Sequence, residues 1–226
     1  MDKPWLKTYP PGTPETISID HYTSLLSVYD DAIERFGDQT AFINMDKKLT
    51  FNELAAKVRD TAAWFQQQGL QKGDRIAIMM PNCLQYPVVL FAAMSAGLTI
   101  VNTNPLYTPR ELRHQLTDSG AKAIVVIENF CHVLEEIITE TDVKTVVTTQ
   151  LGDELPFLKS KLVNFVVKKI KKMVPDWNIS GSITLREVMA QGKHMTLNRP
   201  ELGHEDIAFL QYTGGTTGVA KGAMLA

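Results

Sequence analysis

The feature that most constrains how this chain can fold is the alternation of short apolar runs with helical patterns from residue 75 to residue 148. Arg75 to Met80 has the composition of a buried strand, and an apolar helical pattern follows it from about Leu84 to Ala96. The alternation continues through strand patterns at Thr99 to Asn102, Ala123 to Ile127 and Lys144 to Thr148. Strands that alternate with helices are typical of a parallel sheet covered by helices. The sequence therefore predicts an α/β fold with largely parallel sheet layers and flanking helices.

Side-chain patterns also indicate where individual helices begin and end. Apolar residues recur at helical spacing from Ser24 to Phe36, and Gly37 is expected to end that helix in a left-handed conformation. Thr108 and Glu111 are spaced to satisfy each other's free backbone donors, and Pro109 suits the first turn of a helix. We interpret this segment as a helix cap and not as a set of ligands.

The start of the chain, residues 1–20, is rich in proline and shows no helical or strand period, so we interpret it as an extended arm on the surface. Residues 21–226 then form a domain with a peripheral, basic and irregular segment at about 151–200. The sequence stops at Ala226, directly after what looks like the start of a strand. We therefore expect the domain to be incomplete and the chain to be the amino-terminal part of a larger protein.

Composition excludes several classes of protein. The 226 residues are 44% hydrophobic and 21% charged, which is typical of soluble globular proteins. The formal net charge is only −2, so the overall charge does not favour nucleic acid as a partner. Cys83 and Cys131 are too few for a multi-bridge framework and are expected to be buried, and Met1 to Trp5 has no apolar core for export. These features predict a cytoplasmic location.

One short segment concentrates residues that bind phosphate. Tyr212 to Gly222 contains four glycines, three threonines and Lys221. Glycines let backbone N–H groups approach a phosphate, threonine hydroxyls donate hydrogen bonds, and a lysine adds positive charge. The sequence therefore predicts a polyphosphate-binding loop, whose candidate residues are Tyr212, Thr213, Gly214, Gly215, Thr216, Thr217, Gly218, Val219, Ala220, Lys221, Gly222 and Ala223.

Two common phosphate loops do not fit this segment. The Walker pattern needs a glycine before Lys221 and a serine or threonine after it, whereas Ala220 and Gly222 occupy those positions. No register of the segment gives the glycine spacing of a dinucleotide-binding loop. Strand-forming residues on both sides predict a hairpin and not a loop that opens a helix.

The loop resembles the phosphate-binding motif of the adenylate-forming enzymes, which include acyl-CoA synthetases, peptide-synthetase adenylation domains and luciferases. It departs from the commonest form of the motif at Gly214, often serine, and at Ala220, usually proline. Four other stretches, Leu49 to Leu54, Gly73 to Ile78, Pro81 to Asn82 and Asn104 to Leu112, are similar to the amino-terminal region of bacterial long-chain fatty-acid CoA ligases. The resemblance extends over essentially the whole chain.

This resemblance implies that a long-chain fatty acid is activated in two steps. The carboxylate attacks ATP and releases pyrophosphate, and CoA then displaces AMP from the acyl-adenylate, with Mg²⁺ accompanying the nucleotide. Side-chain contacts to phosphate are expected from Thr213, Thr216 and Thr217, and backbone contacts from Gly214, Gly215 and Gly218, while Tyr212 packs at the base of the loop. The remaining functional residues of the family follow the loop in sequence. No catalytic residue is therefore assigned, the metal ligands are left unassigned, and the isolated chain is expected to be inactive.

A basic amphipathic pattern from Leu162 to Val174 is a second candidate site. Its lysines, Lys168, Lys169, Lys171 and Lys172, are interspersed with apolar residues. Such a helix can lie on an anionic membrane surface. A helix packed on its own domain fits the pattern equally well, so peripheral contact with the inner face of the cell membrane stays open.

The five histidines, His21, His114, His132, His194 and His204, have no acidic partners at metal-like spacing, so we assign no metal site or catalytic triad to them. Two other functions stay open. The first is an adenylate-forming ligase that acts on another carboxylic acid. The second is a nonenzymatic module that binds a nucleotide or a membrane.

Overall fold

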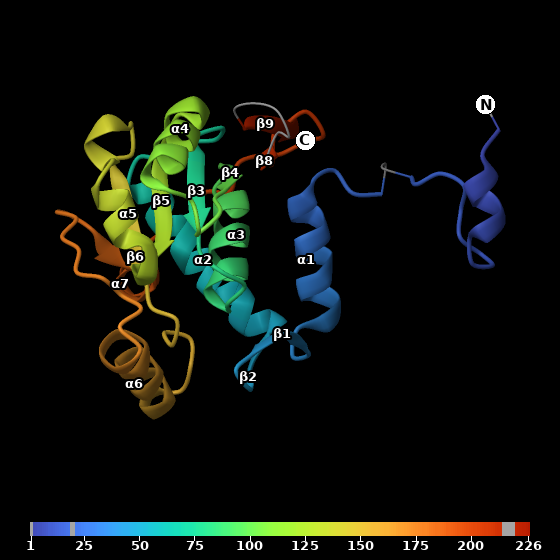
Figure 1. Cartoon of the computed structure of the whole chain (residues 1–226). Coiled ribbons are helices and arrows are strands. Elements are labelled where there is room, and N and C mark those ends of the chain that lie inside the picture. The colour runs from blue at the N-terminus through green and yellow to red at the C-terminus, as the bar shows by residue number, and fades with distance from the viewer. Residues whose placement is uncertain (1, 19–20, 214–219) are drawn as a thin grey trace.

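A computed structural model of the chain describes residues 2–18, 21–213 and 220–226. Among these residues, seven strands form one central sheet in the order β7-β6-β5-β3-β4-β8-β9 (Figure 1). All neighbouring strands are parallel except β8 and β9, which are antiparallel. The strands are β3 Arg75–Met79, β4 Thr99–Asn102, β5 Ala121–Ile127, β6 Thr145–Thr149, β7 Ile183–Thr184, β8 Phe209–Thr213 and β9 Lys221–Leu225. A separate antiparallel pair consists of β1 Thr40–Asn44 and β2 Lys47–Thr50.

Helices connect most of these strands. The α-helices are α1 Leu25–Phe36, α2 Phe51–Gln67, α3 Gln85–Ser95, α4 Pro109–Ser119, α5 Cys131–Glu135, α6 Phe157–Phe165 and α7 Leu185–Gly192. Short 3-10 helices are η1 Pro4–Thr8, η2 Glu128–Phe130 and η3 Ile138–Glu140, and η4 Val166–Ile170 is a π-helix. Across the described ranges, no helix is both long and apolar enough to cross a bilayer.

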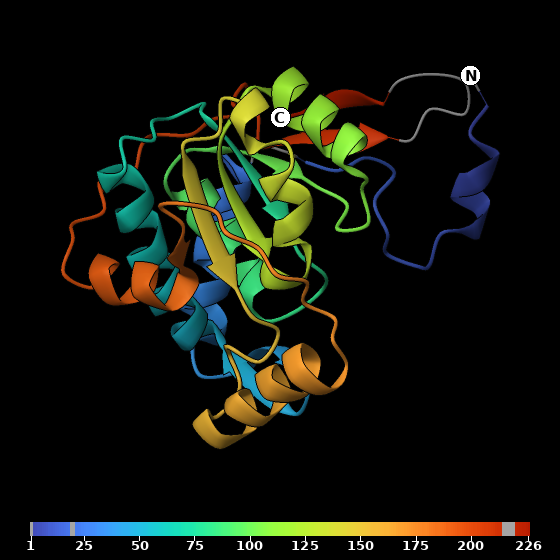
Figure 2. The ribbon, with the colours of Figure 1, turned by 60° about the vertical axis from the view of Figure 1, so that its left-hand side comes forward.

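The central strands are apolar at nearly every position because both faces of the sheet are covered. In β3, Ile76 and Ile78 belong to the core on one face, and Ala77 and Met79 to the core on the other. Helices α1, α2, α3 and α7 contribute to the first core, and α4 and α5 to the second (Figures 1 and 2). The predicted α/β fold, with a largely parallel sheet and flanking helices, is confirmed.

The predicted ends of the helices are correct in most places. Thr108 and Glu111 form the reciprocal cap of α4, and Gly120 ends that helix with a left-handed φ of 59°. Gly37 ends α1 as predicted, but the predicted left-handed conformation is wrong, since its φ is 0° and its ψ is −74°. Its carbonyl accepts a hydrogen bond of 2.8 Å from the backbone N–H of Asn52, and this contact directs the chain toward the start of α2.

The basic helix has other bounds than the sequence predicted. It was expected from Leu162 to Val174, but α6 begins at Phe157 and continues through η4 only to Ile170, and Lys172 has a positive φ of 49°.

Further along, β7 pairs with β6 at the sheet edge, and α7 buries Leu185 and Val188 in the core. At the other end of the chain, residues 2–18 include η1, and none of these residues is buried. The division into arm, domain and peripheral segment stays a prediction.

Candidate functional site

The predicted phosphate loop joins two strands at the edge of the sheet. Strands β8 and β9 pair with Tyr212 opposite Gly222 and Thr213 opposite Lys221. The hairpin predicted from the flanking sequence is therefore confirmed. Because β8 is parallel to β4, the loop leaves the carboxyl end of the sheet, where ligands of open α/β sheets commonly bind.

The structure describes only part of the candidate set. Thr213 and Lys221 are both exposed and stand opposite each other where the loop begins and ends. Ala223 is exposed on β9, and Gly222 and Ala220 are partly buried. The six central residues, Gly214, Gly215, Thr216, Thr217, Gly218 and Val219, lie outside the described residues. The described part of the loop therefore has a threonine and a lysine at paired positions of its two strands.

The base of the loop is bonded to helix α4. Tyr212 is buried, and its hydroxyl donates a hydrogen bond of 2.5 Å to Oδ2 of Asp118. Burial, and then the hydrogen bond to Asp118, raises the pKa of Tyr212 above its ordinary value. On the other side of the loop, Nε2 of His114 lies 3.1 Å from the carbonyl oxygen of Ala220. A carbonyl can only accept, so His114 donates in this contact.

A second polar group lies beside the hairpin on β4. The side chain of Asn102 donates to Oε1 of Gln211 at 3.2 Å and accepts from the hydroxyl of Tyr86 at 2.8 Å. Its backbone carbonyl accepts from Nε2 of Gln115 at 2.9 Å. These bonds connect β4, β8, α3 and α4 at the carboxyl end of the sheet.

Sequence reasoning missed His114, Asp118 and Asn102. It assigned His114 neither a metal nor a triad role and did not consider the other two residues. Asp118 and Tyr212 are separated by 94 positions, and His114 and Ala220 by 106. Because no local pattern links residues at such separations, they could be identified only from the tertiary structure.

The two cysteines do not add a reactive group to the site. Cys83 and Cys131 are both buried, as predicted. Burial raises the pKa of Cys131 to about 12, so its thiol is protonated at neutral pH.

A second surface, which we call the α6 face, consists of apolar side chains along α6 and η4. Six of them are more than half exposed, namely Phe157, Leu158, Leu162, Phe165, Ile170 and Met173. The amino group of Lys161 lies 4.3 Å from the centre of the Phe157 ring. Lys169, Lys171 and Lys172 are exposed on the same segment. The α6 face therefore combines exposed apolar groups with positive charge.

The hydrogen bonds that hold α6 on the domain come from polar side chains. Oδ1 of Asn164 accepts from the backbone N–H of Gly152 at 2.8 Å. The hydroxyl of Ser160, which is buried, accepts from Arg186 at 2.8 Å. Val163 and Val166 are partly buried beside them. The helix thus turns a mainly polar side toward its own domain and large apolar side chains outward, which reverses the usual arrangement of a surface helix.

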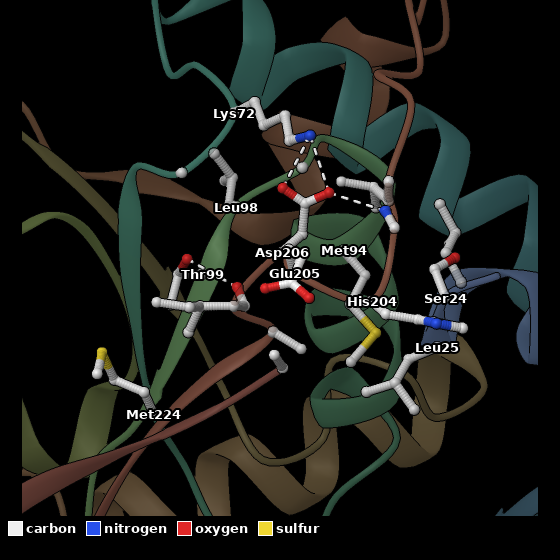
Figure 3. A pocket seen from close by; sticks show the side chains of 18 of the residues that line it. Ser24, Leu25, Lys72, Met94, Leu98, Thr99, His204, Glu205, Asp206 and Met224 are labelled. Atoms are coloured by element: carbon white, nitrogen blue, oxygen red, sulfur yellow. Dashed lines mark hydrogen bonds and ion pairs between the residues drawn. The ribbon is translucent and has the colours of Figure 1, made fainter. Parts of the chain in front are cut away.

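A cavity of about 960 Å³ lies at the opposite end of β8 from the phosphate loop (Figure 3). It is lined by residues that include Leu25, Met94, Leu98 and Met224. Lys72 in its wall forms an ion pair of 2.8 Å with Asp206, and His204 bonds the carbonyl of Tyr22. Because these groups are already paired and the loop is far away along the strand, the cavity does not extend the phosphate site.

Comparison with known proteins identifies the family. A family profile described as AMP-binding enzyme matches residues 29–226. The chain is 53% identical over 226 residues to long-chain-fatty-acid--CoA ligases of Yersinia pestis and of Escherichia coli O157:H7. These alignments cover 100% of this chain and 40% of each relative, so the chain spans less than half the length of the proteins that it matches.

A solved structure gives the same result. The fold is similar to that of a long-chain-fatty-acid-CoA ligase from Archaeoglobus fulgidus, with a TM-score of 0.71 and 27% identity. That match covers 96% of this chain and 39% of the other. The resemblance predicted from the loop and its neighbouring stretches is therefore confirmed, and the chain belongs to the family of AMP-binding enzymes.

Proposed function

We propose that the protein carrying this chain activates long-chain fatty acids with ATP and CoA. The observation that carries the proposal is the 53% identity, over all 226 residues, to a protein named as a long-chain-fatty-acid--CoA ligase. In the first step a carboxylate oxygen bonds to the α-phosphorus of ATP, and the bond to pyrophosphate breaks. In the second step the sulfur of CoA bonds to the acyl carbon, its proton is lost, and AMP leaves.

In this proposal the hairpin acts on the leaving pyrophosphate. Lys221 and Thr213 supply a charge and a hydroxyl at the mouth of the loop, and the predicted donors of residues 214–218 act between them. Donors that are already in position when negative charge moves onto the leaving group stabilise the transition state more than the ground state. The role of the loop is therefore electrostatic stabilisation and positioning, and no catalytic acid or base is assigned to it.

Magnesium is proposed to arrive with the nucleotide. Proteins often bind Mg²⁺ through substrate phosphates, waters and one or two carboxylates. Within the described ranges, no group of three or more His, Cys, Asp or Glu side chains could hold a metal ion. We assign no magnesium site to these residues and derive no step through the ion.

The test starts with a measurement of the intact mass of the protein purified from its native source. Product formation is then measured with fatty acids of increasing length, an aromatic acid and an amino acid. We expect ATP-dependent release of AMP and acyl-CoA with long-chain fatty acids. Replacing Lys221 with alanine should lower kcat/KM for ATP by on the order of 100-fold. The control is Lys193→Ala, which changes an exposed lysine at the end of α7.

Other outcomes would favour the alternatives. Product with the aromatic acid or the amino acid alone would indicate an adenylate-forming ligase for another carboxylic acid. Nucleotide binding without any product would favour a nonenzymatic module.

We also propose that the α6 face makes peripheral contact with an anionic membrane. The outward apolar side chains and the exposed lysines beside them support this, since such a helix combines apolar burial with attraction to acidic lipids. A location in the cytoplasm with contact at the inner membrane face would bring the enzyme close to an apolar substrate.

Sedimentation with lipid vesicles tests the membrane contact. Leu158→Glu should abolish binding to vesicles that contain phosphatidylglycerol. Leu106→Glu is the matched control because Leu158 and Leu106 are both 79% exposed, and Leu106 lies outside the α6 face. Binding that is unchanged in Leu158→Glu would rule the contact out. Equal binding to neutral vesicles would contradict the role of the lysines.

A further inference from the structure

Helix α4 holds both ends of the phosphate loop, on the same side of the helix. Asp118 accepts from the hydroxyl of Tyr212, at the start of the loop, and His114 donates to the carbonyl of Ala220, near its end. His114 and Asp118 are separated by one helical turn, so they stand on one face of α4. We call this pair of bonds the α4 clamp.

The helix that carries the clamp is fixed at both of its ends. At its start, the hydroxyl of Thr108 accepts from the N–H of Glu111, and Pro109 occupies the first turn. At its end, Arg75 donates to the carbonyls of Ser119 and Gly120 at 2.9 and 3.1 Å. A helix held in this way is a rigid support for a loop.

The buried side of α4 adds to this rigidity. Leu112 and Leu116 are fully buried in the core against the sheet. Between them, Gln115 donates to the carbonyl of Asn102 on β4, at 2.9 Å. Because β4 is also the neighbour of β8, the helix and the hairpin share one support.

We propose that His114 and Asp118 are positioning residues that fix Tyr212 and Ala220, on either side of the central loop residues, and so support the binding of the β and γ phosphates of ATP. Neither residue contacts phosphate in this proposal, which rests on the proposed function of the loop. Fixing both ends in advance lowers the conformational entropy that the loop loses when it binds. Loss of either bond should therefore weaken ATP binding and leave the sites for the acid and CoA unchanged.

Steady-state kinetics test the proposal, with the protein as it occurs in its native source and with variants of that protein. Asp118→Ala and His114→Ala should each raise KM for ATP by about tenfold, as expected for one strong hydrogen bond. KM for the fatty acid and for CoA should not change. Asp118→Asn keeps an acceptor for the Tyr212 hydroxyl and should restore most of the affinity. The control is Arg113→Ala on the same helix, because Arg113 pairs with the exposed Glu140 and not with the hairpin.

Hydrogen exchange separates this proposal from the proposed function. The backbone amides of β8 and β9 next to the loop should exchange faster in Asp118→Ala and His114→Ala than in Arg113→Ala. If the unchanged protein makes no acyl-CoA, the proposed function fails. The α4 clamp is then tested only by the hydrogen exchange of the β8 and β9 amides in these variants. Unchanged exchange and unchanged KM for ATP would overturn the clamp. Equal increases in all three KM values, with a lowered Tm, would show a general loss of structure and would also overturn it.

Discussion

Gly222 illustrates how one residue can control the geometry of the loop base. It stands opposite Tyr212 across the hairpin. A Cβ atom at this position would lie 3.0 Å from Cε2 of Tyr212 and 3.1 Å from Cζ, which is closer than ordinary contact. The absence of a side chain therefore leaves room for the tyrosine ring beside Gly222, from where its hydroxyl reaches Asp118.

We predict that Gly222→Ala displaces the Tyr212 ring and destabilises the fold by about 1 to 3 kcal/mol, the usual cost of overpacking. Urea unfolding measures this change. Gly203→Ala is the control, because a Cβ there would have no atom within 4 Å. Equal stability of the two variants would contradict the prediction.

Asp74 is a carboxylate with polar partners on both of its oxygens. Its Oδ1 lies 2.6 Å from Nζ of Lys122, and its Oδ2 accepts from the N–H of Gln71 at 3.0 Å. Burial raises the pKa of Asp74, but these partners outweigh burial and hold it below its ordinary value of 3.8. A carboxyl with a lowered pKa in the folded state stabilises above its unfolded pKa, and this contribution is lost as the pH falls through the folded pKa.

We therefore predict that Asp74→Asn makes the free energy of unfolding less dependent on pH below about pH 4. The measurement is urea unfolding from pH 6 to pH 3. Asp176→Asn, at an exposed position, provides the control. A variant with the same pH dependence as the unchanged protein would show that Asp74 does not contribute.

At the scale of elements, α4 and α7 share with α2 the same threonine–glutamate cap but have different tasks. Thr108 with Glu111 caps α4, and Thr184 with Glu187 caps α7. Helix α4 contacts the loop through His114, whereas α7 packs in the core on the other face of the sheet.

We predict that Thr108→Ala and Thr184→Ala each lower the free energy of unfolding by about 1 kcal/mol, the typical value of an N-cap. Only Thr108→Ala should also raise KM for ATP, because it loosens the helix that carries the clamp. Unfolding and kinetic measurements on both variants test this. A raised KM for ATP in Thr184→Ala would mean that general stability, and not α4, sets the affinity.

At the scale of the whole molecule, the two candidate sites are far apart. Figure 2 shows α6 at one end of the sheet and the β8–β9 hairpin at the other, and Figure 1 agrees. Distant sites with no shared partners contribute independently.

We predict that Leu158→Glu abolishes vesicle binding and leaves KM for ATP unchanged, whereas Lys221→Ala weakens the use of ATP and leaves vesicle binding unchanged. The double variant should show both defects without further loss. A change in KM for ATP on adding vesicles to Leu158→Glu would instead reveal coupling between the two ends.

The sequence by itself determined the features that depend on neighbouring residues. The apolar run of β3, the cap of α4 and the strands on both sides of the phosphate loop were all predicted correctly, because each follows from side chains a few positions apart. The bounds of α6 were not, since a π-helix and a turn at Lys172 end the helix before the apolar pattern does.

Only the tertiary structure decided which distant residues meet. The order of the strands brings His114 and Asp118 to the loop, and the polar contacts of Asn164 and Ser160 decide that α6 turns its apolar side chains outward. The amphipathic pattern fixes that a helix has two faces, but it does not fix which face meets the domain. That choice depends on the free energy of contacts between segments far apart in the chain, and these contacts exist only once the sheet has formed.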